Sequence, residues 1–154
     1  MLSVGCGGRR EAGGSIRLPD ALSATLEIEL SEPTSSISEA LENQKASSTA
    51  KITSVRLRAS MVDGNDLRDA TEEELNQLAF DQPEIELRSY GDAVTHRAPN
   101  GASFTLRDLL SAIEETERRT RHQSEWFGGI DAHHVFFEGL EREPDGVWQI
   151  GWGS

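Results

Sequence analysis

The feature that most constrains the fold is a helix signal over residues 105–121 that encodes its own beginning. Thr105 is a natural N-cap, and Asp108, three residues later, can accept a hydrogen bond from the backbone amide of Thr105. Phe104 and Leu109 flank this cap at the spacing of a hydrophobic staple. We therefore expect a helix over about 106–121 whose apolar stripe faces a core, made of Leu106, Leu109, Leu110 and Ile113.

The charged residues that follow this stripe mix both signs and form no basic patch. The whole chain has 27 acidic and 15 basic residues, and its formal net charge is −12. Phosphate groups repel such a surface, which argues against binding to nucleic acid or to an anionic membrane. We interpret the charged side chains of the helix as one solvated face: Glu114, Glu115, Glu117, Arg118, Arg119 and Arg121.

A β-hairpin is predicted directly after the helix. Residues 133–142 are rich in β-forming side chains, Pro144-Asp-Gly146 is a strong turn signal, and residues 147–152 return as a partner strand. On the returning strand Trp148, Ile150 and Trp152 share one face, because side chains alternate along a strand. We expect these residues to contribute to the core.

Alternation of apolar and polar residues predicts two further strands, over 22–30 and 55–61. Between these two strands the sequence predicts a short helix opened by Ser36 and Glu39, followed by a loop over 43–50. After the second strand it predicts a break at Asp63-Gly64 and then a helix that is opened by Thr71 and Glu74 and continues through Leu75, Leu78 and Ala79. Two further strands are predicted at 85–87 and 94–97.

Together these elements predict a single soluble, acidic α+β domain over residues 20–154, with a mixed or antiparallel sheet and helices packed on one face. The order hairpin, helix, hairpin favours a β-grasp-like arrangement in the C-terminal half. Residues 1–19 are rich in glycine, and we expect a flexible leader there. A single cysteine, Cys6, permits no internal disulfide, and no apolar run approaches the roughly 18 residues of a membrane span, so the expected location is the cytoplasm or the nucleus.

The densest polar and aromatic stretch is residues 126–139, and it supplies the candidate binding residues. Trp126 is suited to a ligand pocket or a protein-binding patch. Asp131 and His133 would project from one face of a strand and His134 from the other, and with His122 they could form a two-histidine, one-carboxylate metal site. The spacing matches no established metal motif, so we predict no metal or cofactor.

Several segments of the last third resemble small uncharacterised proteins of mushroom-forming fungi. The segments are FTLRDLL at 104–110, WFGGID at 126–131, HHVFFEGL at 133–140, DGVW at 145–148 and WGS at 152–154. In those proteins a T-[VL]-x-D-[VL]-L helix precedes an F-x-G-[LI] strand and a final D-G-x-[WY] strand. The resemblance implies a eukaryotic intracellular domain and supplies no catalytic residues.

No convergent set of catalytic side chains emerges from the sequence, and we assign no catalytic residue. The sequence therefore favours a non-enzymatic module that binds another protein. The alternative is a small-molecule or metal-dependent enzyme centred on the histidine, aspartate and aromatic residues of 122–139.

Overall fold

The computed structural model describes residues 15–30, 52–123 and 134–154. In this part of the chain the elements are, in order, β1 (Leu22–Leu30), β2 (Ile52–Asp63), β3 (Asp66–Asp69), α3 (Glu72–Leu75), β4 (Leu78–Phe80), β5 (Glu84–Arg88), β6 (Val94–Arg97), β7 (Phe104–Thr105), α4 (Leu106–Thr120), the 3-10 turn η2 (Arg121–Gln123), β8 (Phe136–Arg142) and β9 (Trp148–Gly153). The α+β class expected from the sequence is confirmed.

Seven of the strands form one mixed sheet, in the order β3-β2-β1-β8-β9-β5-β6, and β4 pairs with β7 in a second, small sheet. The hairpins β5–β6 and β8–β9 lie side by side through a parallel contact between β5 and β9. Because α4 connects these hairpins, the order β6-β5-β9-β8 has the β-grasp-like form predicted for the C-terminal half. The strands β1, β2 and β3 extend the sheet beyond β8.

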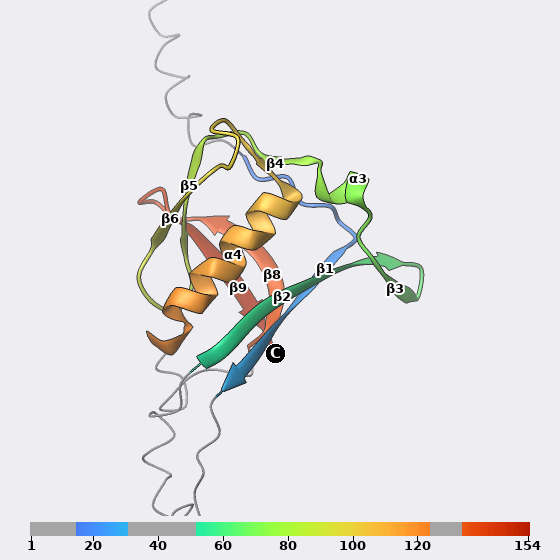
Figure 1. Cartoon of the computed structure of the whole chain (residues 1–154), viewed down its shortest axis with the longest axis horizontal. Helices are drawn as coiled ribbons and strands as arrows, with labels where there is room; N and C mark the ends of the chain where they lie inside the picture. The colour runs from blue at the N-terminus through green and yellow to red at the C-terminus, as the bar shows by residue number, and fades with distance from the viewer. Residues whose placement is uncertain (1–14, 31–51, 124–133) are drawn as a thin grey trace, which may run out of the picture.

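The core lies between α4 and one face of the large sheet (Figure 1). Leu109 and Ile113 on α4 are fully buried, and Ile150 and Trp152 on β9 are buried against the same core. Trp148 packs at the margin of this core. The face predicted for β9 is therefore a core face, because alternate residues of the strand point toward the helix.

The start of α4 follows the predicted local rules. The Thr105 hydroxyl accepts a hydrogen bond from the Asp108 amide (3.1 Å), and the Asp108 carboxylate accepts one from the Thr105 amide (3.0 Å). Phe104 and Leu109, the two members of the predicted staple, are both buried. The helix ends at Thr120, and η2 continues the chain to Gln123.

One prediction in the middle of the chain is wrong. The segment opened by Thr71 is helical only to Leu75, and Leu78 and Ala79 belong to β4 instead. Pairing of β4 with β7 satisfies its backbone and buries Ala79, which continuation of the helix would not do. The predicted break at Asp63-Gly64 is confirmed, since β2 ends at Asp63; the chain also turns there and returns as β3, which was not predicted, with Gly64 at a φ of 68°.

Residues 15–19, before β1, are joined to the small sheet. Ile16 forms a β-bridge with Phe80, and the amide of Arg17 donates to the carbonyl of Ala79 at 2.8 Å. The predicted helix at Ser36 and the loop at 43–50 lie outside the described residues, as do residues 1–14 of the predicted leader.

Candidate functional site

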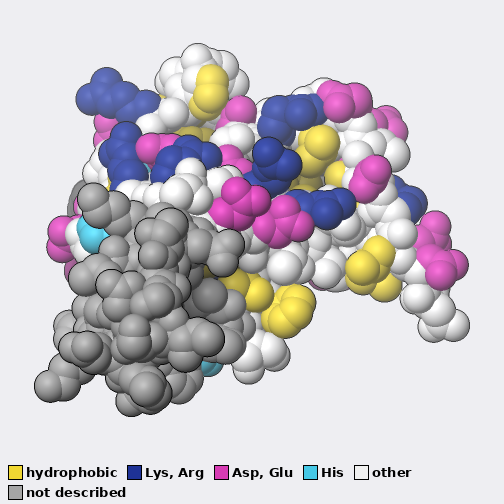
Figure 2. Space-filling view, turned by 60° about the horizontal axis from the view of Figure 1, so that its bottom comes forward, with side chains coloured by type: hydrophobic (Ala, Val, Ile, Leu, Met, Phe, Trp, Pro, Cys, Tyr) yellow, Lys and Arg dark blue, Asp and Glu magenta, His cyan; other side chains and the backbone are white. Residues whose placement is uncertain are grey.

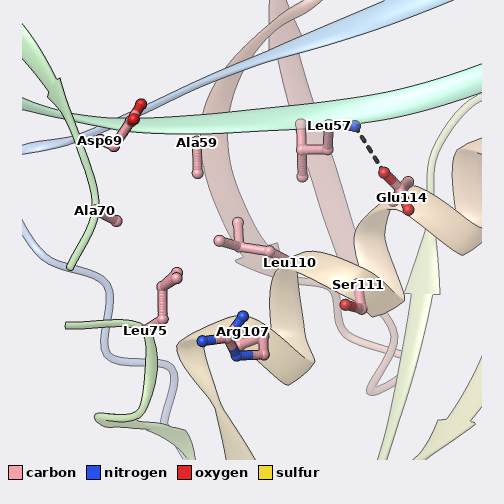
Figure 3. Close-up of a pocket in the computed structure, with 9 residues that line it drawn as sticks. All are labelled: Leu57, Ala59, Asp69, Ala70, Leu75, Arg107, Leu110, Ser111 and Glu114. Carbon is pink, nitrogen blue, oxygen red and sulfur yellow. Dashed lines mark hydrogen bonds between the residues drawn. The ribbon is translucent and has the colours of Figure 1, made fainter. Parts of the chain in front are cut away.

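A groove of about 290 Å³ lies between β2, α3 and the N-terminal half of α4 (Figure 3). The side chains of Leu57, Leu75 and Leu110 point into this space from the three elements. Polar groups lie at its margin, and these belong to Asp69, Arg107, Ser111 and Glu114. The groove therefore has an aliphatic floor and a polar rim.

Small side chains and a short strand leave this space open. Ala59 on β2, Ala70 after β3 and Ser111 on α4 line the groove without filling it. β2 has 12 residues whereas β3 has 4. β3 pairs only with residues 60–63 of β2, so the described part of the chain places no strand beside the rest of that edge.

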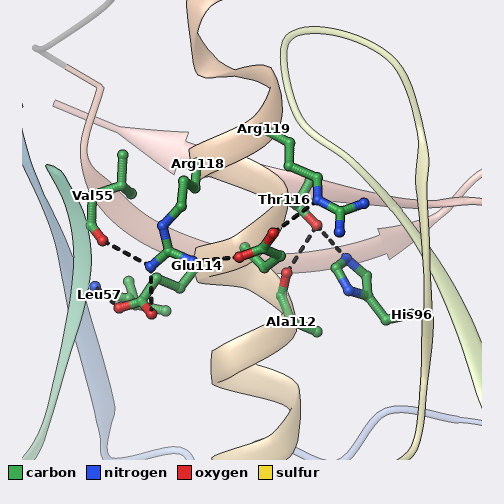
Figure 4. A network of polar contacts seen from close by, with 9 residues as sticks. Val55, Leu57, His96, Ala112, Glu114, Thr116, Arg118 and Arg119 are labelled. Carbon is green, nitrogen blue, oxygen red and sulfur yellow. Dashed lines mark hydrogen bonds and ion pairs between the residues drawn. The ribbon is translucent and has the colours of Figure 1, made fainter. Parts of the chain in front are cut away.

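Two side chains of α4 bind the backbone along this edge of β2 (Figure 4). The Glu114 carboxylate accepts a hydrogen bond from the Leu57 amide at 2.9 Å, and the Arg118 guanidinium donates to the Val55 carbonyl at 3.3 Å. Glu114 and Arg118 also pair with each other at 3.2 Å. We call these two side chains the clasp. They satisfy backbone groups that an edge strand would otherwise present to solvent or to another chain.

The α3 wall of the groove is held by a second group of ion pairs. The Arg68 guanidinium donates two hydrogen bonds of 2.8 Å to the Glu74 carboxylate, which also closes a capping box with Thr71. The bonds from Arg68, followed by the bond from the Thr71 amide, lower the pKa of Glu74 to about 2. Arg107 pairs with Glu72 across the end of the groove. These contacts connect α3 to β3 and to α4, and so fix the position of the wall.

A buried ion pair lies at the other end of α4. Glu117 and Arg121 are both fully buried and approach to 2.9 Å. The Trp152 indole donates to the Glu117 carboxylate at 2.9 Å, and the Arg121 guanidinium lies over the rings of Tyr90 and Trp152. The prediction that the charged residues of this helix form one solvated face is therefore wrong. Glu117 lies four residues after Ile113 and Arg121 four residues after Glu117, so both continue the core stripe.

His96 is a partly buried histidine on the opposite side of α4 (Figure 4). Its Nε2 lies 2.7 Å from the Thr116 hydroxyl, which donates its own proton to the Ala112 carbonyl at 2.8 Å. Thr116 can therefore only accept from His96, so Nε2 carries the proton and Nδ1 is the atom that titrates. Burial, followed by the positive charge of Arg119, lowers the pKa of His96.

Most of the binding residues predicted from the sequence lie outside the described residues, namely Trp126, Asp131 and His133. His134 is described, and its carbonyl accepts a hydrogen bond from Arg121 at 3.0 Å. His122 is exposed in η2. Within the three described ranges no cluster of histidine, cysteine or carboxylate side chains could hold a metal ion. A site centred on 122–139 stays a prediction.

Comparison of the chain with models of known protein families, with curated proteins and with solved structures finds no match. Among the helices of the described ranges, none is both long and apolar enough to cross a membrane.

The groove was missed by reasoning from the sequence, because it depends on two strands of unequal length. Leu57 and Ala59 were assigned to a strand correctly, but the return of the chain as β3 was not anticipated. A signal was present in the segment Asp63–Asp69, where Asp-Gly precedes a short polar run. Recognition of that hairpin would have exposed the difference in length.

Proposed function

We propose that the protein is a non-enzymatic module that binds another protein through the groove between β2, α3 and α4. The observation that carries this proposal is an aliphatic groove of about 290 Å³ that runs beside an edge of β2 with no strand partner in the described part of the chain. Ligand pockets for whole small molecules start near this volume, so the groove suits one or two side chains of a larger partner.

The polar groups of the groove favour binding over chemistry. Arg107 is engaged by Glu72, and Glu114 is engaged by Leu57 and Arg118. Asp69 lies opposite Ser60 in the strand register, and its carboxylate points away from Leu110 (Figure 3). The remaining hydroxyl, from Ser111, has no histidine beside it among the residues that line the groove. Such a set lacks the adjacent nucleophile and base that covalent catalysis requires.

The rim of the groove is suited to a protein partner, because Asp69, Arg107 and Glu114 place charges of both signs beside its aliphatic floor. Figure 2 shows basic and acidic side chains in one mixed band across a face of the molecule, with apolar surface exposed between them. A mixed polar rim around an apolar centre is the ordinary composition of a protein–protein interface.

Selection from a random peptide library tests this function. We expect wild-type protein to enrich peptides that bind at least about tenfold more weakly to Ser111→Trp, because an indole at Ser111 would fill the groove. Ala102→Trp adds the same side chain to an exposed loop before α4 and should leave binding unchanged. Thermal melts should show that both variants fold.

Two outcomes would refute the proposal. One is enrichment of no peptide on folded wild-type protein relative to denatured protein. The other is a set of peptides that bind equally to wild type and to Ser111→Trp.

A further inference from the structure

We infer that the edge of β2 beside which no described strand lies accepts an extended peptide as an added antiparallel strand, in line with β3, and that this peptide alternates aliphatic and acidic residues. The inference rests on the proposed function, since it specifies how a partner occupies the groove. β3 already pairs antiparallel with residues 60–63 of the same edge. A peptide beside residues 55–59 would continue that strand.

The backbone of β2 is oriented for such pairing. The Leu57 amide and the Val55 carbonyl point away from β1, as their bonds to the clasp demonstrate. Backbone groups alternate in direction along a regular strand, so those of Val55, Leu57 and Ala59 point to the same side. The register against β1 shifts beside Thr53, so the regular edge begins at Val55, and every second residue from 55 to 59 can pair with an incoming peptide.

One face of the added strand would meet the groove. Residues opposite Leu57 and Ala59 share their side of the sheet, which is the side that faces α4. Their side chains would contact Leu75 and Leu110 across the groove. A volume of about 290 Å³ accommodates aliphatic side chains there.

The other face of the added strand would lie beside Arg56 and Arg58. Both side chains are exposed on the side of β2 that faces away from α4. Arg58 pairs with Glu27 at 3.3 Å, and Arg56 forms no ion pair with any other described residue. Acidic residues of the peptide would stand about 5 Å from these arginines, where opposite charges attract and like charges repel.

The charge pattern also disfavours a second copy of the chain as the occupant. In an antiparallel pairing centred on Leu57, Arg56 of one copy would lie opposite Arg58 of the other. The net charge of −12 repels an acidic peptide at long range, but salt limits that effect to about 8 Å under physiological conditions. The local pairs with Arg56 and Arg58 act within this distance.

The clasp would have to leave the edge when the peptide binds. Its two bonds to Leu57 and Val55 would be exchanged for backbone bonds to the peptide. Glu114 and Arg118 would keep their ion pair with each other, and Arg118 also contacts Glu115. The clasp is therefore a competitor of the peptide, and its removal should strengthen binding.

The probe is the capped hexapeptide acetyl-Val-Glu-Leu-Glu-Val-Glu-amide, titrated into the full chain and followed by NMR. We expect slower hydrogen exchange at the amides of Val55 and Ala59. The lysine analogue acetyl-Val-Lys-Leu-Lys-Val-Lys-amide should bind at least about fivefold more weakly. In an antiparallel strand the aliphatic residues of the peptide direct their amides toward β2. N-methylation of the central leucine should therefore abolish binding, whereas N-methylation of the following glutamate should not.

Glu114→Ala removes the acceptor that competes for the Leu57 amide, and it should strengthen binding of the acidic peptide about three- to tenfold. Glu115→Ala is the matched control, because it removes a neighbouring carboxylate whose ion pairs, with Arg118 and Arg119, lie within α4. It should change binding less than about twofold.

The inference is overturned if the edge amides stay unprotected, if the lysine peptide binds equally well, or if N-methylation of the leucine has no effect. It is also overturned if the edge amides become protected without peptide as the protein concentration rises, which would indicate a second copy. Library peptides that need an open groove but leave Val55 and Ala59 unprotected would uphold the proposed function and refute strand addition alone.

Discussion

Glu117→Gln isolates the charge of the buried ion pair, because it keeps the shape of the side chain and an oxygen that can accept from Trp152. In the folded protein Glu117 and Arg121 are fully buried and 2.9 Å apart. The substitution leaves the guanidinium in place after its paired charge has been removed. Removal of one partner from a buried ion pair is strongly destabilising.

The expected magnitude is about 3–5 kcal/mol of unfolding free energy. Coulomb's law gives a similar value, about 4 kcal/mol for unit charges 4 Å apart at an effective dielectric constant near 20. The lower part of the range applies here, because Arg121 also bonds to the His134 carbonyl and lies over two aromatic rings. Those contacts offset part of the loss.

Urea unfolding at neutral pH, followed by circular dichroism, measures the effect in a double-mutant cycle. Glu117→Leu and Arg121→Met should each also be destabilising, but the double variant Glu117→Leu/Arg121→Met should be less destabilised than either of these single variants, since no buried charge remains. In the double variant Trp152 can still donate to the Ser89 hydroxyl, which lies at 3.2 Å. A cost for Glu117→Gln below about 1 kcal/mol, or single effects that simply add, would refute this reasoning.

Three further predictions concern α4 and its neighbours. Thr105→Ala should cost about 0.5–2 kcal/mol in urea unfolding, because it removes the N-cap acceptor of the Asp108 amide, whereas Thr105→Ser should cost less. Ile113→Ala should cost about 2–5 kcal/mol in the same assay, since the side chain is fully buried, and a cost below about 1 kcal/mol would contradict that burial. The pKa of His96 is lowered in the folded protein, so folding favours its neutral form. Its contribution to stability is therefore complete above the unfolded pKa of about 6.5, and it is lost as the pH falls through the lower pKa of the folded state. The stability advantage of wild type over His96→Gln should therefore shrink between about pH 7.5 and pH 5.5, and a constant difference would refute the argument.

Local signals in the sequence predicted the elements that are determined locally. The cap and staple of α4 depend on residues at most five positions apart; the cap is present, and both staple residues are buried. The strand β1 was recognised over its full range from alternation alone, and β9 from its turn and its aromatic face. The β-grasp-like order also followed, because two hairpins separated by one helix have few ways to share a sheet.

Nonlocal pairing explains the elements that were missed. Leu78 and Ala79 have helical spacing after Leu75, but pairing with β7, more than twenty residues later, determines their conformation. β3 has four exposed residues and no apolar alternation, so its own sequence gives little sign of a strand. β3 is a strand because its backbone pairs with the edge of β2.

The candidate groove was not predicted, since it is the space that remains where β3 stops and β2 continues. Sequence reasoning pointed instead to the aromatic and histidine residues of 122–139, where side-chain chemistry is dense. A binding surface made of alanines, leucines and a strand edge has no such chemical signature. It becomes visible only once the register of β2 against β3 is known.

The charged residues of α4 give the strongest reason to read such a helix together with its sheet. Glu114 with Arg118, Glu115 with Arg119, and Glu117 with Arg121 all have the same four-residue spacing. The first pair binds a strand edge, the second is exposed, and the third is fully buried. Rotation of about 100° per residue separates these environments, so the position of each pair relative to the core stripe at Ile113 determines its role. The four-residue spacing alone predicts that each glutamate meets its arginine. The position of the pair relative to the apolar stripe of α4 predicts whether the pair is buried, exposed or beside a strand edge.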